Sequence, residues 1–251
     1  TVVAFLFHTQ EYQRFQPRIQ YRDGYLQRQA DDRAFDRYRH RQHRHFGYGA
    51  RCAGNVDFAT RQEKAQKRQL TLVRLGTSGA IQPDIKVGQF VFARTSVGFD
   101  GLLNYYKGRN EVCDLEIEKA FMKHTGWSDL LPKPYFIDAD PSLAELFRDV
   151  TIEGITIAAP GFHAPQGRWV RLEPADIHLN EKIESFDYHG RRVTNFEMES
   201  SALAGLAALM GHKAATICTI IAQRIALDAC TDYKPFVRKM IQTALDKLAT
   251  L

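Results

Sequence analysis

Residues 15–54 of this chain contain almost none of the aliphatic side chains from which a protein core is built. These forty residues hold one Ile and one Leu, with no Val and no Met. Arg, Gln, His and Tyr take their place, and neither a strand period nor a helix period fits the segment. It cannot bury enough apolar area to offset the entropy lost on ordering it. On composition alone, the segment is typical of a disordered basic arm.

The same segment carries the whole excess of positive charge. The chain has a formal net charge of +5 and a calculated pI of about 9.0. Residues 15–54 contain nine Arg, no Lys and four Asp, a net of +5, so the remaining residues sum to zero. A basic patch of this kind suggests nucleic acid as a partner. A nucleic-acid-binding protein is therefore one alternative, and its affinity would fall steeply with salt.

From residue 55 onward the sequence has ordinary α/β character. Apolar runs predict strands at 72–75, 87–93, 154–159 and 214–222, and periodic apolar positions predict helices at 141–150 and 196–210 and from Pro235 onward. The glycine-rich residues 76–79 are predicted to form a turn. Strands that alternate with helices favour an α/β sheet with helices on its faces, and 251 residues suffice for one such domain.

Several classes of protein and site are disfavoured by the sequence. No apolar run reaches the roughly 18 residues that a membrane-spanning helix needs, so no membrane association is expected. Thr1 is not an initiator Met, and we expect that the chain lacks its true beginning. The four cysteines lack the spacing of metal ligands and fit free thiols of a reducing cytosol, so no metal is expected; they are Cys52, Cys113, Cys218 and Cys230.

Four motifs occur in a fixed order in this part of the chain. They are Val73-Arg74-Leu75-Gly76-Thr77-Ser78-Gly79-Ala80-Ile81-Gln82-Pro83, Phe162-His163-Ala164-Pro165-Gln166-Gly167-Arg168, Asn195-Phe196-Glu197-Met198-Glu199-Ser200 and Ile220-Ile221-Ala222-Gln223-Arg224. Each motif alone is weak, but together they closely resemble the uridine phosphorylases of the nucleoside phosphorylase family. The resemblance covers residues 55–251.

The resemblance implies a fold, an activity and an assembly. The fold would be a single α/β domain, spanning 1–251, around a mixed, partly closed β-sheet flanked by helices. The reaction would be phosphorolysis of uridine to uracil and ribose 1-phosphate, with inorganic phosphate as co-substrate and no cofactor. The enzyme would be cytoplasmic, and it would be a hexamer built from dimers that acts on small molecules rather than nucleic acid.

Arg74 and Thr77 are the candidate phosphate-binding residues. A guanidinium offers a fork of donors to phosphate oxygens, and a hydroxyl with backbone N–H groups can complete the cradle. Without the other motifs, Arg74 would more often be a surface arginine on an edge strand beside a plain turn.

Phe162, Gln166, Arg168 and Arg224 are the candidate base-binding residues. A Gln amide can pair with a donor and an acceptor of uracil, and an Arg can stabilise the negative charge of the leaving base. By resemblance, Phe162 stacks on the ring and Arg224 acts through water. Taken alone, the second motif is equally typical of a polar loop. His163 stands where relatives often have another residue, so its role stays open.

Glu197, Met198 and Glu199 resemble the residues that bind the ribose. Glu199 would accept hydrogen bonds from the ribose hydroxyls, and Met198 would lie beneath the sugar. If these residues are helical, the two carboxylates point to different faces, and Glu199 is the one expected to reach the substrate. Core packing on the apolar stripe of the helix is the alternative for Met198. Arg74, Gln166 and Arg168 would carry the catalytic step.

Two other enzymatic interpretations stay open. A relative that cleaves purine nucleosides is one, although its purine-specific Asp would stand where this chain has Gln223-Arg224. A relative that uses water instead of phosphate is the other. Substrate profiles with and without phosphate would separate them.

The residues that the family places before residue 55 are missing in the frame as written. If Phe15, Gln16, Pro17 and Arg18 are read as TTC, CAA, CCG and CGA, codons begun one base later give Ser-Asn-Arg-Glu. With permitted codons, all 39 positions from 15 to 53 accept the family pattern. The decoded segment has a net charge of about −3, which would remove the basic patch. We expect residues 15–54 to be a frame-shifted segment and the polypeptide as written to be inactive.

Overall fold

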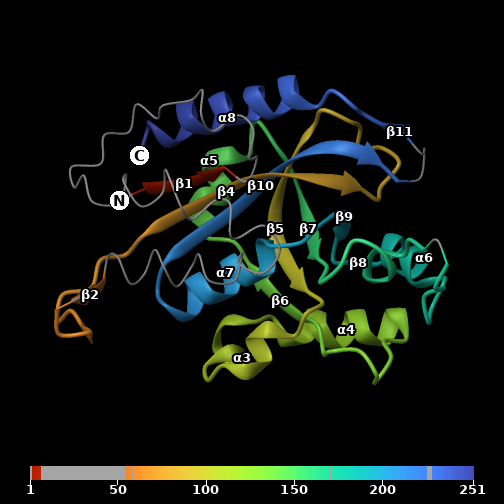
Figure 1. The fold of residues 1–251 in the computed structure, drawn as a ribbon, viewed down its shortest axis with the longest axis horizontal. Helices are drawn as coiled ribbons and strands as arrows, with labels where there is room; N and C mark the ends of the chain where they lie inside the picture. The colour runs from red at the N-terminus through yellow and green to blue at the C-terminus, as the bar shows by residue number, and fades with distance from the viewer. Residues whose placement is uncertain (1, 7–54, 58, 170, 225–227) are drawn as a thin grey trace. The chain divides into compact units, whose positions relative to one another are not determined.

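The computed structural model describes residues 2–6, 55–57, 59–169, 171–224 and 228–251 (Figure 1). The whole of the shifted segment 15–54 therefore lies outside the described residues. Two compact units are present: a large one of residues 1–5 and 70–251, and a small one of residues 6–69. In the small unit, strands β2 (Val56–Asp57) and β3 (Gln62–Glu63) pair, and the Asn55 side chain exchanges two hydrogen bonds with the backbone of Arg68.

The large unit is built around a mixed sheet. Its strands are β1 (Val2–Leu6), β4 (Thr71–Ala80), β5 (Phe90–Gly98), β6 (Tyr135–Asp138), β7 (Ile152–Ala158), β8 (Asp187–Tyr188), β9 (Arg191–Glu197), β10 (Lys213–Gln223) and β11 (Asp228–Ala229). Its helices are η1 (Leu102–Tyr105), α3 (Arg109–Val112), α4 (Leu115–Thr125), α5 (Pro141–Phe147), η2 (Ala164–Gln166), α6 (Leu179–Glu184), α7 (Ser200–Leu209) and α8 (Lys234–Leu248).

The sheet closes on itself over part of its length. Neighbouring strands follow the order β1-β4-β10-β5-β7-β9-β8, and β4 also pairs with β9. In this extra pairing Gly79 lies opposite Phe196, and Ala80 lies opposite Asn195. The β4–β10, β5–β7 and β7–β9 pairs are parallel, whereas the β10–β5 and β4–β9 pairs are antiparallel. The expected α/β fold with a mixed, partly closed sheet is confirmed.

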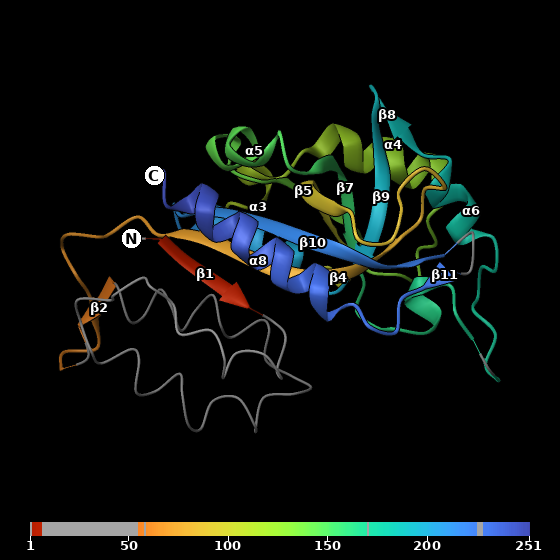
Figure 2. The same cartoon turned by 90° about the horizontal axis from the view of Figure 1, so that it is seen from above.

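Helices cover the sheet. α7 packs on β10, β5 and β7. α8 packs along β10 and β4, as Figure 2 shows. Sequence signals account for the helix ends: Asp114 and Asp140 cap α4 and α5 through their carboxylates, and α4 ends at Gly126 with φ of 60°. The apolar faces meet in a core that contains Phe121, whose ring contacts Phe136 and Phe186 edge-on.

The strand predicted at 72–75 is longer than expected. β4 continues through residues 76–79, which pair in parallel with Cys218, Thr219, Ile220 and Ala222 of β10. The expected glycine-rich turn is therefore wrong. Gly76 lacks a side chain for another reason, because a Cβ there would lie 2.9 Å from the Arg74 guanidinium nitrogens.

The predicted helix at 196–210 begins later than expected. Phe196 and Glu197 are the last residues of β9, and α7 begins only at Ser200. Their pairing with β7, in which Glu197 lies opposite Ala158, outweighs the local helical pattern. Met198 and Glu199 therefore lie in the strand-to-helix connection, and the argument from helix faces does not apply to them. The other predicted elements are confirmed with shifted ends.

Candidate functional site

Arg74 lies at the centre of a buried charged cluster. Arg74 is only 3% exposed, and its side chain projects from β4 toward the connection between β9 and α7. Its Nη1 is 2.9 Å from Glu197 Oε2, and its Nη2 donates to Glu199 Oε2. Nη1 also donates to the Cys218 sulfur at 3.5 Å. Burial lowers the pKa of Arg74, but the Glu199 and Glu197 carboxylates outweigh it and raise the pKa overall.

Glu197 joins Arg74 to the beginning of α7. Its carboxylate accepts hydrogen bonds from the backbone N–H groups of Glu199 and Ser200, at 2.8 Å and 3.0 Å. It also accepts from the Ser200 hydroxyl at 2.6 Å. A carboxylate here satisfies N–H groups that the first turn of a helix leaves without an internal partner, and it favours the positive end of the helix dipole. Glu197 thus has structural partners within the protein itself.

Met198 and Glu199 are more accessible than Glu197. The Met198 residue is 42% exposed, so core packing is excluded for it, and the Glu199 side chain is 16% exposed. The structure therefore brings Arg74, Glu197 and Glu199 together. The thioether of Met198 lies at the surface beside them.

Thr77 shares β4 with Arg74, but no hydrogen bond joins the two residues in the described part of the chain. Alternation along the strand places Thr77 on the opposite face from Arg74 and Gly76. Ser78 shares the face of Arg74, and its Oγ is buried with no hydrogen-bond partner among the described residues. The sequence motif did not distinguish these two neighbouring hydroxyls.

Gln166 connects two arginines from different elements. Its side-chain Oε1 accepts a hydrogen bond from Arg168 Nη1 at 2.7 Å, and its backbone oxygen accepts one from Arg224 Nη2. Gln166 is 4% exposed and ends the short helix η2. Arg168 Nη1 also donates to the Phe162 backbone oxygen at 3.1 Å, and its guanidinium carbon lies 4.1 Å from the Phe162 ring centroid. Phe162 itself is 57% exposed.

The two guanidinium groups raise the positive potential around Gln166. Arg224 follows the last residue of β10, and its guanidinium carbon lies 4.5 Å from the Phe196 ring centroid. Burial and the neighbouring Arg168 lower the pKa of Arg224 to about 10, and burial lowers that of Arg168. Arg224 Nη1 is buried and has no hydrogen-bond partner within the described residues. Arg168 and Arg224 are two partly desolvated cations that both donate to Gln166, and such a pair favours an anionic ligand.

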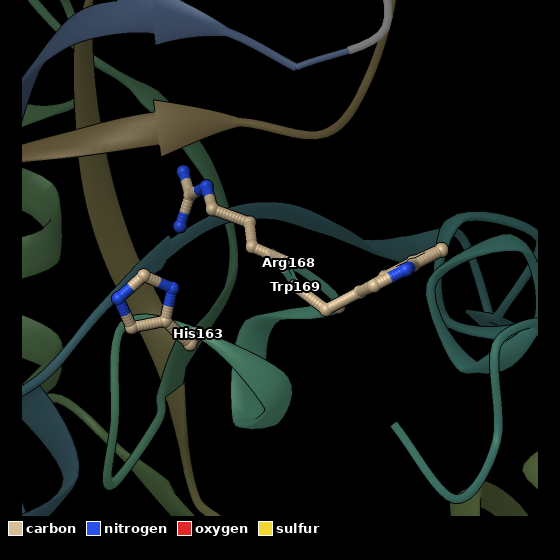
Figure 3. A pocket seen from close by; sticks show the side chains of 4 residues that line it. His163, Arg168 and Trp169 are labelled. Atoms are coloured by element: carbon tan, nitrogen blue, oxygen red, sulfur yellow. The ribbon is translucent and has the colours of Figure 1, made fainter. Parts of the chain in front are cut away.

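A cavity of about 460 Å³ opens beside these groups. Its lining residues are His163, Gly167, Arg168 and Trp169. Figure 3 shows the side chains of His163 and Arg168 on one side and the indole of Trp169 extending away from both. His163, whose role the sequence left open, thus lines the cavity. Trp169, 47% exposed, was missed because it follows the last recognisable motif residue.

Gln223 does not reach the cavity. It is 5% exposed, and its Nε2 donates to the backbone oxygen of Gln82 at 2.8 Å. Gln82 in turn donates from its Nε2 to the backbone oxygens of Glu184 and Val193. These bonds tie the end of β10 to β9 and α6. Of the pair Gln223-Arg224, only Arg224 therefore contacts Gln166.

The described residues contain no group of three or more His, Cys, Asp or Glu side chains arranged to hold a metal ion. In the same part of the chain, no helix is both long enough and apolar enough to cross a membrane.

The chain is similar to known proteins over residues 54–251. A family model described as the phosphorylase superfamily matches residues 54–251. A uridine phosphorylase from Thermococcus kodakarensis is 33% identical over 164 residues, which are 62% of this chain and 49% of that protein. A uridine phosphorylase from Escherichia coli is 28% identical over 166 residues, 65% of this chain and 57% of that protein. The chain thus spans about half the length of these relatives.

A solved structure has the same fold. It is a Trypanosoma brucei nucleoside phosphorylase described as showing uridine phosphorylase activity. The TM-score is 0.70 at 21% sequence identity, over 80% of this chain and 74% of that one. The family match over residues 54–251 covers well over half of the chain and includes all four motifs. The chain belongs to the phosphorylase superfamily.

Proposed function

We propose that the site binds uridine and inorganic phosphate and catalyses phosphorolysis to uracil and ribose 1-phosphate. The observation that carries the proposal is the arrangement at Gln166, where an amide and two guanidinium groups meet beside an exposed Phe162. Family membership and the resemblance to uridine phosphorylases support it.

The choice of uracil follows from the hydrogen-bond capacity of Gln166. Its Oε1 accepts from Arg168 and keeps one lone pair, while its Nε2 can donate. Together they match the N3–H donor and the adjacent carbonyl acceptor of uracil. Cytosine presents the opposite pattern on that edge, so it would leave groups of the site without partners. Phe162 offers the face on which the base stacks.

The two arginines act on the leaving base. As the bond to the anomeric carbon breaks, the bonding electrons pass to the uracil nitrogen and negative charge spreads over the ring. Arg168 and Arg224 are positioned to stabilise that charge, and the unpartnered Nη1 of Arg224 is available to it directly or through water. An Asp at the place of Arg224 would suit a purine, whose nitrogen takes a proton instead. The positive charge therefore favours a pyrimidine.

Arg74 and Glu199 act at the other end of the substrate. We assign Arg74 to phosphate and Glu199 to the ribose hydroxyls. The Thr77 side chain points to the other face of β4, so only its backbone N–H is left to join Arg74 at the phosphate. Met198, exposed beside Glu199, is assigned to the face of the sugar. In the structure, Arg74 and Glu199 bind each other. Phosphate therefore competes with Glu199 for Arg74, and release of the carboxylate makes it available to the sugar. The contacts of Glu197 suit a structural part in this cluster.

The reading frame is part of the proposal. The family match begins at residue 54, where the unusual segment ends. We propose that residues 15–54 are read in a shifted frame, and that restoring the frame supplies an arginine which family resemblance assigns to phosphate. Resemblance likewise supports a cytoplasmic hexamer built from dimers. A nucleotide read across the codons for residues 13–56 tests the frame: one base fewer near Arg14 and one more near Gly54 are expected.

Substrate profiling tests the proposed reaction. The frame-restored protein is expected to release uracil from uridine only when phosphate is present, and to act poorly on cytidine and inosine. The polypeptide as written is expected to show no phosphate-dependent cleavage. Uracil and ribose 1-phosphate are measured by chromatography. Faster cleavage of inosine would favour the purine alternative, and equal cleavage without phosphate would favour a hydrolase.

A further inference from the structure

The backbone oxygen of Gln166 accepts a second hydrogen bond that no motif predicted. Asn180 Nδ2 donates to it at 3.1 Å, in addition to the bond from Arg224 Nη2. A carbonyl oxygen has two lone pairs, and these two donors occupy both. The carbonyl therefore links α6, which carries Asn180, to the end of β10, which precedes Arg224.

Asn180 lies on α6, a helix that core packing and a hydrogen bond hold in place. Ile183, one turn further along α6, is 0% exposed and belongs to the main core cluster. The backbone oxygen of Glu184, the last residue of α6, accepts a hydrogen bond from Gln82 Nε2 at 3.0 Å. α6 therefore holds the Asn180 amide at a fixed position relative to β4 and β9, and the Gln166 backbone is held there in turn.

Gly167 leaves the space that this contact needs. Its φ is +68°, in the left-handed region that favours glycine. A Cβ at this position would lie 2.1 Å from Asn180 Nδ2. The amide of Asn180 thus packs directly against the backbone between Gln166 and Arg168, the two residues assigned to the base.

We propose that Asn180 is a positioning residue for the pyrimidine site, because its amide fixes the Gln166 backbone and thereby orients the Gln166 side chain and Arg224. The inference rests on the proposed function, since it concerns the same base. Asn180 has no assigned contact with substrate and acts through Gln166 alone. Loss of its bond leaves Gln166 oxygen with one donor and frees the 166–168 backbone to move.

Uracil binding to the whole 251-residue polypeptide tests this inference, because every base-site residue lies in its described part. The chain has two tryptophans, and Trp169 lines the cavity. In a Trp127→Phe background, fluorescence of Trp169 therefore reports uracil. Asn180→Ala is expected to raise the Kd about five- to tenfold, as loss of one hydrogen bond implies. Asn180→Asp, equal in shape but unable to donate when ionised, is expected to raise it further.

The matched control is Asn104→Ala. Asn104 Nδ2 also donates to a backbone oxygen, that of Lys133 at 2.9 Å, but outside the base site. The Asn104→Ala variant is expected to leave the uracil Kd unchanged. Thermal unfolding is measured for each variant to check that it is folded. If Asn180→Ala and Asn180→Asp bind uracil like the parent, or if Asn104→Ala weakens binding equally, the inference is overturned. If the parent itself does not bind uracil, the proposed function fails first.

Discussion

Replacement of Arg74 by Met is expected to lower the free energy of unfolding by about 3–5 kcal/mol, because it leaves the carboxylates of Glu197 and Glu199 without their buried cation. The side chains of Arg74 and Glu197 are only 4% and 1% exposed, so water cannot replace the lost contact. Met fills a similar volume, which keeps the effect electrostatic. Urea unfolding of the 251-residue protein and its variant measures the difference.

Two companion variants separate charge from packing. Arg192→Met removes an exposed partner of Asp84 and is expected to cost only about 0–1 kcal/mol, since that pair is solvated. Adding Glu197→Gln and Glu199→Gln to Arg74→Met should recover much of the lost stability, because removing all the charges leaves none unpaired. An Arg74→Met protein as stable as the parent would contradict the buried ion cluster.

Replacement of Arg168 by Ala in the frame-restored protein is expected to lower kcat/KM for uridine by about 100- to 1,000-fold, the usual effect of removing a donor from developing charge. The variant also removes the hydrogen bond that orients the Gln166 amide and the contact with the Phe162 face. Steady-state rates of uracil release at saturating phosphate measure the change.

Arg168→Lys and Arg192→Ala are the controls for this prediction. Lys keeps the charge but lacks the planar fork, so partial activity is expected. Arg192 pairs with Asp84 on the surface, and its replacement should leave kcat/KM unchanged. Activity of Arg168→Ala within a few-fold of the parent would exclude this arginine from the catalytic step.

The sequence predicted the fold class because the apolar runs of the buried strands are long and uninterrupted. It failed at two places where pairing between distant strands decides the structure. Glycines at 76–79 look like a turn, but β10 pairs with them from more than 130 residues away. Phe196 and Glu197 look helical, but β7 holds them in a strand. Neither partner is visible in the local sequence.

The motifs identified the main site residues, but they did not predict which of these residues contact one another. Gln166 was expected to bind a base, and the structure adds that two arginines donate to its side-chain and backbone oxygens. Asn180 and Trp169 were not predicted as site residues because neither belongs to a motif. Asn180 reaches Gln166 across 14 residues through the position of α6, which depends on core packing rather than on local sequence.

The most direct test of the uracil site is a titration of the 251-residue polypeptide with free bases, followed by Trp169 fluorescence in the Trp127→Phe background. Uracil is expected to bind saturably, and cytosine and hypoxanthine at least about tenfold more weakly, because each leaves a hydrogen-bonding group of the site unsatisfied. Tighter binding of hypoxanthine, or no saturable binding of uracil, would contradict a pyrimidine site built around Gln166, Arg168 and Arg224.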